Sequence, residues 1–224
     1  MDKTTFDTLK NNYGQYASWA IWDPDPEASD CYCSLDDYSF QDIEKRIKPN
    51  IVIIALNPSN KKKENSPNNK TKKPFSNFHT LKGDKFHHIT KENIKKLIYA
   101  LENGPDLENL KGTFTGAYMT DIVKRDGLGS NSNEVLKRVK KDESLQKECK
   151  EKLEDELRLL GSKKPLIIVL GRAAEYIFKN YIKLKHYYIT HYSYTDYNEE
   201  QYKEEFWNAI INEYKIDINS YLAK

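Results

Sequence analysis

The feature that most constrains the fold is one short apolar run, Ile51–Leu56, which ends at Asn57-Pro58-Ser59. Most of its side chains are β-branched, and no polar residue interrupts it. An unbroken apolar run that stops at a turn signal is typical of a strand buried on both faces, as in the centre of a parallel sheet. Pro58 has no backbone N–H with which to continue the ladder, so we expect this strand to end at Asn57.

Three more short apolar stretches indicate strands, and amphipathic helical patterns lie between them. The predicted strands span 51–57, 113–123, 166–170 and 186–190, and the predicted helices span 4–20, 40–48, 91–102, 142–160, 172–182 and 199–213. This alternation predicts an α/β fold with a four-stranded, mostly parallel sheet and helices on both faces. The 224 residues show no repeat and no linker, so we expect a single domain over 1–224.

Composition excludes some classes of protein. No apolar run approaches the roughly 18 residues that a membrane-spanning helix needs, and the first residues carry no apolar signal region. We therefore expect a cytoplasmic protein without a membrane partner, and a monomer. The three cysteines, Cys31, Cys33 and Cys149, are too few for a disulfide framework or a cysteine-only metal site, so we expect no metal and no cofactor.

The stretch after the first predicted strand, residues 60–88, concentrates positive charge although the net charge of the chain is only +2. It contains eight lysines against one Glu and one Asp, together with Phe75, Phe78 and Phe86. A long loop after a strand in a compact domain usually has a function or is disordered. Lysines interleaved with aromatic rings suit phosphate contacts and base stacking, whereas a solvated lysine surface over buried rings is the alternative.

Three polar residues follow three of the predicted strands at their carboxyl ends, namely Asn57, Asp121 and His191. In an open parallel sheet these ends face one crevice, where ligands bind. Each residue alone has an ordinary explanation, and Asn57 also fits a simple Asn-Pro-Ser turn. Together, beside a loop rich in lysine and aromatic residues, they predict a ligand site.

Short blocks of the sequence are similar, in order, to the motifs of one known family. Ile53–Ser59 is similar to a strand that ends in Gly-x-Asn-Pro, and Pro74–Ser76 to a segment whose aromatic ring stacks on an extruded base. Tyr118–Lys124 is similar to a strand that ends in Thr-Asn-x-x-Lys. Leu166–Ala174 and then His191–Ser193 are similar to a third strand and a His-Pro-Ser motif. Together the blocks resemble the uracil-DNA glycosylase superfamily, in particular its mismatch-specific branch.

The resemblance implies a DNA glycosylase of the DNA-repair type, which flips a nucleotide out of DNA and hydrolyses its N-glycosidic bond. Cleavage builds positive charge on the sugar and negative charge on the departing base. The Asn57 amide would position the attacking water, and His191 would hydrogen-bond the base oxygen as charge develops there. Phe75 would stack on the flipped base. The candidate phosphate-binding residues for single- or double-stranded DNA are Ser59, Ser193, Lys61, Lys62, Lys63, Lys72 and Lys73.

The sequence departs from the family pattern at the residue that reads the base. The family commonly has Asn there, which both donates and accepts hydrogen bonds, whereas this chain has Asp121, which only accepts when ionised. An acceptor repels a carbonyl oxygen and favours an exocyclic amine, so we expect a cytosine-type base, plain or modified, rather than uracil. Tyr192 replaces the proline of His-Pro-Ser, Ala55 replaces a glycine, and the cysteine quartet of the iron–sulfur branch is missing.

Two other functions fit the same sequence. A catalytically silent member of the fold would bind a protein partner, or nucleic acid in a salt-dependent way, and would leave every base intact. An enzyme acting on a free nucleotide or nucleoside would use the same crevice without needing the lysines of 60–73. Replacing those lysines by Ser separates the possibilities, because only a protein that uses DNA should then bind more weakly.

Overall fold

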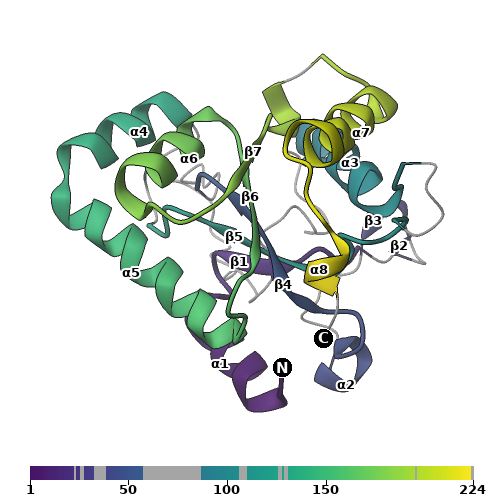
Figure 1. Ribbon diagram of the computed structural model, residues 1–224, viewed down its shortest axis with the longest axis horizontal. Helices are drawn as coiled ribbons and strands as arrows, with labels where there is room; N and C mark the ends of the chain where they lie inside the picture. Colours follow the sequence, from purple (N-terminus) through teal and green to yellow (C-terminus); the bar gives the residue numbers. More distant parts are fainter. Residues whose placement is uncertain are drawn as a thin grey trace.

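The centre of the chain is a five-stranded mixed sheet, seen in a computed structural model that describes residues 1–22, 24–25, 28–32, 39–57, 87–105, 110–125, 128, 131–194 and 196–222. The strands of this sheet are β1 Ala17–Trp19, β4 Lys48–Ala55, β5 Ala117–Asp121, β6 Leu166–Leu170 and β7 Tyr187–Ile189, and β2 Pro24–Asp25 pairs separately with β3 Ala28–Tyr32. The order across the sheet is β1-β5-β4-β6-β7 (Figure 1). β4 pairs in parallel with β5 and β6, β6 pairs in parallel with β7, and β1 joins β5 in the antiparallel sense.

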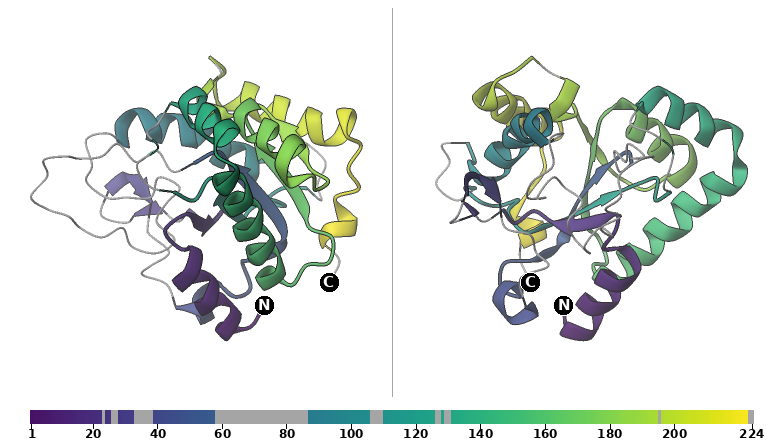
Figure 2. Two further views of the ribbon diagram at one scale, coloured as in Figure 1. Left: turned by 90° about the vertical axis from the view of Figure 1, so that its left-hand side faces the viewer. Right: turned by 180° about the vertical axis from the view of Figure 1, so that it is seen from behind.

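Helices cover both faces of this sheet (Figure 1, Figure 2). One layer contains α1 Lys3–Tyr13, α4 Ser132–Lys141, α5 Glu143–Leu160 and α6 Arg172–Ile177, and the other contains α3 His87–Glu102 and α7 Glu199–Asn208. The remaining elements are the π-helical turns η2 Phe178–Ile182 and η4 Ala209–Glu213, the 3-10 turn η3 Tyr192–Tyr194, and the short helices α2 Phe40–Ile43 and α8 Asn219–Leu222. The mixed sheet with helices on both faces confirms the predicted α/β class. Among the described residues, none of the helices has the length and apolar character to cross a membrane.

Strand β4 lies in the middle of the sheet and is buried on both faces. Its side chains Val52 and Ile54 pack with α1, α4, α5 and α6, whereas Ile51 and Ile53 pack with α3 and α7. These four side chains are at most 1% exposed. This burial on both sides is the reason that Ile51–Leu56 shows no alternation of polar and apolar residues.

The prediction of four strands is wrong, because a fifth strand lies at the edge of the sheet. Residues 4–20 are predicted as one helix, but α1 ends at Tyr13 and β1 pairs with β5. All three residues of β1 are buried. Such a strand shows neither the alternation of a half-buried strand nor the length of a fully buried one, so its sequence carries no strand signal.

Other boundaries also differ from the predictions. β5 begins only at Ala117, after a turn in which Gly116 has φ +85° and a Cβ on Gly116 would lie 1.8 Å from the carbonyl oxygen of Arg46. The predicted helix 40–48 is reduced to the single turn α2, since β4 already begins at Lys48. Helix α4 lies in a stretch for which the sequence predicts no element, and the side chain of Asn131 caps its first turn.

Candidate functional site

The carboxyl ends of the four parallel strands meet along one edge of the sheet. Asp121 of β5 pairs with Ala55 of β4, and Leu170 of β6 pairs with Ile189 of β7. The register between β4 and β6 aligns these two pairs. The four residues therefore form one row across the sheet, and the polar residues that follow it lie along the edge at which ligands bind in open α/β sheets.

Asn57 and His191 lie just beyond this row, two residues after the last paired residues of β4 and β7. Between them, the end of β6 is occupied by Gly171, which has φ +89° and ψ 149°. A Cβ on Gly171 would lie 3.1 Å from the Cβ of His191, so His191 lies over the end of β6. Adjacent strands are about 4.8 Å apart, which puts the axes of β4 and β7 about 10 Å apart. The glycine keeps the interval between Asn57 and His191 free of a β6 side chain.

The imidazole of His191 is held in one protonation state. The backbone N–H of Ser193 donates to Nδ1 at 3.2 Å, and Ser193 Oγ lies 2.7 Å from the same nitrogen. A backbone N–H can only donate, so Nδ1 is the accepting nitrogen and the proton of the neutral ring lies on Nε2. Burial lowers the pKa of His191 from 6.5 to about 4. At neutral pH the side chain is therefore an uncharged imidazole that offers Nε2–H as a donor.

Asp121 and Tyr192 lie on the side of the sheet covered by α3 and α7. Asp121 follows Met119 by two residues along β5, so it shares the face of Met119, and it is 4% exposed. Tyr192 belongs to the cluster on that face and is also 4% exposed. Its ring stacks on His191 with centroids 4.2 Å apart and an interplanar angle of 28°. Burial and the negative charge of Asp121 raise the pKa of Tyr192, so the phenol is neutral at neutral pH.

On the other face of the sheet, a buried polar network fixes the end of β5. Lys124 Nζ donates to the carbonyl oxygen of Asp121 at 2.5 Å and lies 2.6 Å from Glu156 Oε2. Glu156 Oε1 accepts from Tyr118 Oη at 2.8 Å and from Thr120 Oγ1 at 2.7 Å. The side chains of Lys124 and Glu156 are 0% exposed. This ion pair and its hydrogen bonds hold the backbone of Asp121 in one position.

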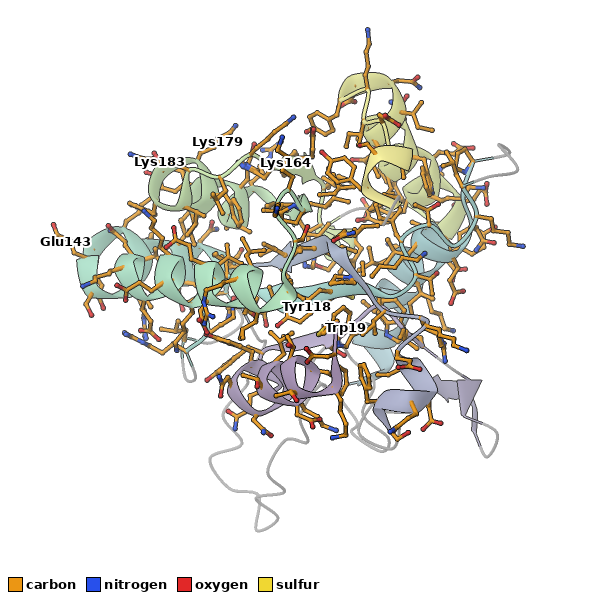
Figure 3. The ribbon with its side chains drawn as sticks, turned by 60° about the horizontal axis from the view of Figure 1, so that its bottom comes forward. Trp19, Tyr118, Glu143, Lys164, Lys179 and Lys183 are labelled. Atoms are coloured by element: carbon orange, nitrogen blue, oxygen red, sulfur yellow. The ribbon has the colours of Figure 1, made fainter. Side chains whose placement is uncertain are left out.

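The edge strand β1 supports this network. The ring of Trp19 packs edge-on against the ring of Tyr118, with centroids 5.1 Å apart and an angle of 68° (Figure 3). Trp19 is 1% exposed and Tyr118 is 0% exposed. The rotamer of Tyr118, and with it the hydrogen bond to Glu156, is therefore set by a strand that the sequence did not predict.

The structure brings some of the predicted site residues together and does not describe others. Asn57, Asp121 and His191 share one edge of the sheet, as the sequence predicts. Ser193 is exposed and contacts the His191 ring, while its contact with phosphate stays a prediction. The predicted residues that lie outside the described part of the chain are Phe75, Ser59, Lys61, Lys62, Lys63, Lys72 and Lys73.

Sequence reasoning did not identify two residues that shape the site, Glu156 and Tyr192. Glu156 does carry a signal, because it lies on the apolar stripe of α5 between Leu153 and Leu160. A charged residue on such a stripe needs a buried partner. Tyr192 carries no signal beyond its place in a motif that resembles His-Pro-Ser, since its burial in the cluster on the α3 face depends on distant parts of the chain.

Neither a metal site nor a known relative identifies the function. Within the described residues, no group of three or more His, Cys, Asp or Glu side chains is placed to hold a metal ion. Comparisons with models of protein families, with curated proteins and with solved structures find no significant match. The function must therefore be argued from the chemistry of the strand ends.

Proposed function

We propose that the protein is a DNA glycosylase that hydrolyses the N-glycosidic bond of a flipped, cytosine-type base. The observation that carries the proposal is the neutral Nε2–H donor of His191, which lies across the end of β6 from Asn57. An amide, a neutral donor and a carboxylate at the ends of three parallel strands suit binding of a polar base and cleavage of its bond to the sugar. The resemblance of the sequence motifs to the uracil-DNA glycosylase superfamily supports the same function.

His191 and Asn57 have separate tasks in this reaction. The bond between the sugar C1′ and the base nitrogen breaks with its electron pair leaving on the base. His191 Nε2–H donates to the base oxygen O2 while negative charge grows there. The Asn57 amide oxygen accepts from a water and aims it at C1′. The water oxygen adds to C1′ and one of its protons ends on the departing base, which gives an abasic sugar and a neutral free base.

Asp121 selects the base in this proposal. Its carboxylate accepts hydrogen bonds and, when ionised, has none to donate. The exocyclic amine of a cytosine-type base can donate to it, whereas the O4 carbonyl of uracil is repelled. Lys124 holds the backbone of Asp121, so the side chain of Asp121 starts from a fixed position at the end of β5.

The proposal is tested by base excision. Purified protein is incubated with single- and double-stranded oligonucleotides that carry one cytosine, 5-methylcytosine, 5-hydroxymethylcytosine or uracil, and alkali reveals abasic sites as strand breaks. We expect breaks at a cytosine-type base. Asn57→Ala and His191→Ala should each lower the rate by about 100-fold or more, the usual effect of removing one group that stabilises the transition state.

Asn50→Ala is the matched control for the Asn57 variant. Asn50 lies in the same strand, and its Nδ2 is 3.5 Å from the carbonyl oxygen of Tyr221, on a different part of the molecule from the carboxyl end of β4. This variant should keep full excision activity. Binding of DNA with every base left intact would contradict the proposal and would favour a catalytically silent nucleic-acid-binding protein.

A further inference from the structure

Helix α4 carries a cluster of positive charges that neighbouring acidic residues do not balance. Over 135–141 the helix contains four cations and no acidic residue, and all four cations are exposed. None of the ion pairs between described residues involves them. Like charges three or four positions apart on a helix repel each other, so this cluster destabilises α4 slightly. Its members are Lys137, Arg138, Lys140 and Lys141.

The neighbouring helix α5 shows the contrasting pattern, in which exposed lysines have counter-ions. Lys147 Nζ lies 3.6 Å from Glu151, and Lys150 Nζ lies 3.9 Å from Glu154, each one helical turn further along. Such alternation of charge is typical of a solvated helix surface. A cluster of one sign instead raises the local concentration of an oppositely charged partner. The unbalanced charge on α4 therefore indicates an anionic ligand.

An exposed aromatic ring joins α4 to a second basic segment. Helices α4 and α6 pack together, and Lys140 Nζ lies 4.0 Å from the centre of the Tyr176 ring, which is 36% exposed. Helix α6 continues into η2, where Lys179 and Lys183 point away from the sheet (Figure 3). Lys179 pairs with Glu175 at 2.7 Å, whereas Lys183 forms no ion pair with another described residue. The exposed cations of α4, Tyr176 and Lys183 together form one basic surface.

This basic surface begins beside the candidate site. Helix α6 starts immediately after Gly171, the glycine that lies against His191 at the end of β6. Tyr176 follows Gly171 by about 7.5 Å along the helix axis, at a rise of about 1.5 Å per residue. A strand of DNA whose target base lies at the strand ends can therefore extend across Tyr176 and onto α4.

We propose that the basic surface of α4 and η2 is a second DNA-binding surface, which holds the phosphates that flank the target base. The inference rests on the proposed function, which supplies the DNA, and it adds a surface separate from the strand ends. Lys137, Lys141 and Lys183 contact phosphate oxygens, which positions the DNA without reading its sequence. The Tyr176 ring contacts a base or sugar of the flank, because aromatic rings among cations are the pattern that binds single strands.

The test measures the salt dependence of DNA binding by fluorescence anisotropy, with the full chain and labelled single- and double-stranded oligonucleotides. The variant Lys137→Gln/Lys141→Gln removes two phosphate contacts. The slope of log affinity against log salt should then fall in magnitude by about 1.8 for a duplex and about 1.4 for a single strand. Between about 50 and 200 mM KCl, the affinity of the wild type should therefore fall by about tenfold more than that of the variant.

Lys147→Gln/Lys150→Gln is the matched control, because it removes the same charge from α5, where each lysine has a counter-ion. This control should keep the wild-type slope. Unfolding in urea separates binding from a structural role, since Lys137→Gln/Lys141→Gln should be at least as stable as the wild type once the like charges are gone. Tyr176→Ala should weaken binding of single strands about fivefold or more and leave the slope unchanged, because the ring carries no charge.

The outcomes separate this inference from the proposed function. Equal slopes in the wild type and Lys137→Gln/Lys141→Gln would overturn the inference, and excision by the same protein would leave the glycosylase standing. Poly-glutamate that binds as tightly as DNA, with no effect of Tyr176→Ala on either ligand, would assign the surface to an acidic protein and also overturn the inference. A reduced slope in a protein that excises no base would support the second DNA-binding surface and contradict the glycosylase.

Discussion

Glu156→Gln removes one charge from the buried ion pair behind Asp121, and this single change should destabilise the fold strongly. The side chains of Lys124 and Glu156 are 0% exposed, and Lys124 Nζ lies 2.6 Å from Glu156 Oε2. Among the described residues Oε2 has no hydrogen bond of normal geometry, so it depends on the charge of Lys124. The Gln side chain keeps an oxygen that can accept from the hydroxyls of Tyr118 and Thr120. The loss of stability in Glu156→Gln therefore measures the removal of the charge and not the loss of those two hydrogen bonds.

Removal of one partner from a buried ion pair costs about 3–5 kcal/mol of unfolding free energy, because the other charge is left uncompensated. For a chain of this size about 1 kcal/mol lowers Tm by about 2–4 °C, so we expect a fall of about 6–20 °C. The assay is equilibrium unfolding in urea followed by tryptophan fluorescence. Trp19, which packs on Tyr118, reports directly on the region of the network.

Glu148→Gln is the matched control, because it breaks only partly exposed ion pairs. Glu148, on the same helix as Glu156, lies 2.7 Å from Lys152 and also pairs with Arg125. The side chains of Glu148, Lys152 and Arg125 are 25%, 37% and 40% exposed. The loss of the Glu148 charge should cost about 1 kcal/mol or less. The loss of unfolding free energy in the double variant Lys124→Met/Glu156→Gln should be smaller, by at least about 1 kcal/mol, than the summed losses of the two single variants. Equal losses of unfolding free energy in Glu156→Gln and Glu148→Gln would refute the claim that the buried ion pair stabilises the fold.

Three further predictions concern single residues near the site or in the core. Gly171→Ala should displace His191 and abolish excision, because its methyl group would lie 3.1 Å from the His191 Cβ at φ +89°. Gly161→Ala, at φ +72° with nothing within 4 Å, should lose only stability, about 1–2 kcal/mol in urea melts, and stay active. The pKa of His191 is lowered from 6.5 to about 4, so the stability that the neutral ring contributes should be lost as pH falls from 6.5 to about 4. The loss should reach at most about 3 kcal/mol and should be absent from the pH dependence of His191→Gln. Cys149 is 1% exposed and its thiol pKa is raised to about 11, so a maleimide should label it at least about 100-fold more slowly in the native protein than in urea, as followed by mass spectrometry.

The parts of the fold that depend on local pattern could be predicted from the sequence. Ile51–Leu56 predicts a central strand because burial on both faces requires an unbroken apolar run. Strand β1 could not be predicted, because three buried residues at a sheet edge have no pattern of their own. The pairing of β1 with β5 depends on a contact between residues far apart in the sequence, such as Ala17 with Thr120.

The same division applies to the candidate site. Asn57, Asp121 and His191 could be predicted, because polar residues at the ends of parallel strands must share an edge. The protonation state of His191 could not, since it depends on the backbone N–H of Ser193 and on burial. The effect of the Asp121 charge on the pKa of Tyr192 likewise arises only after the sheet has formed.

The most direct test of the proposed site is the identity of the base that the wild type and Asp121→Asn release. Free bases from oligonucleotides that carry cytosine or uracil would be measured by mass spectrometry. We expect the wild type to release the cytosine-type base, and Asp121→Asn to shift toward uracil, because an amide can donate to O4 and accept from N3–H. Release of uracil by the wild type, or the same preference in both proteins, would contradict the assignment of Asp121 as the residue that selects the base.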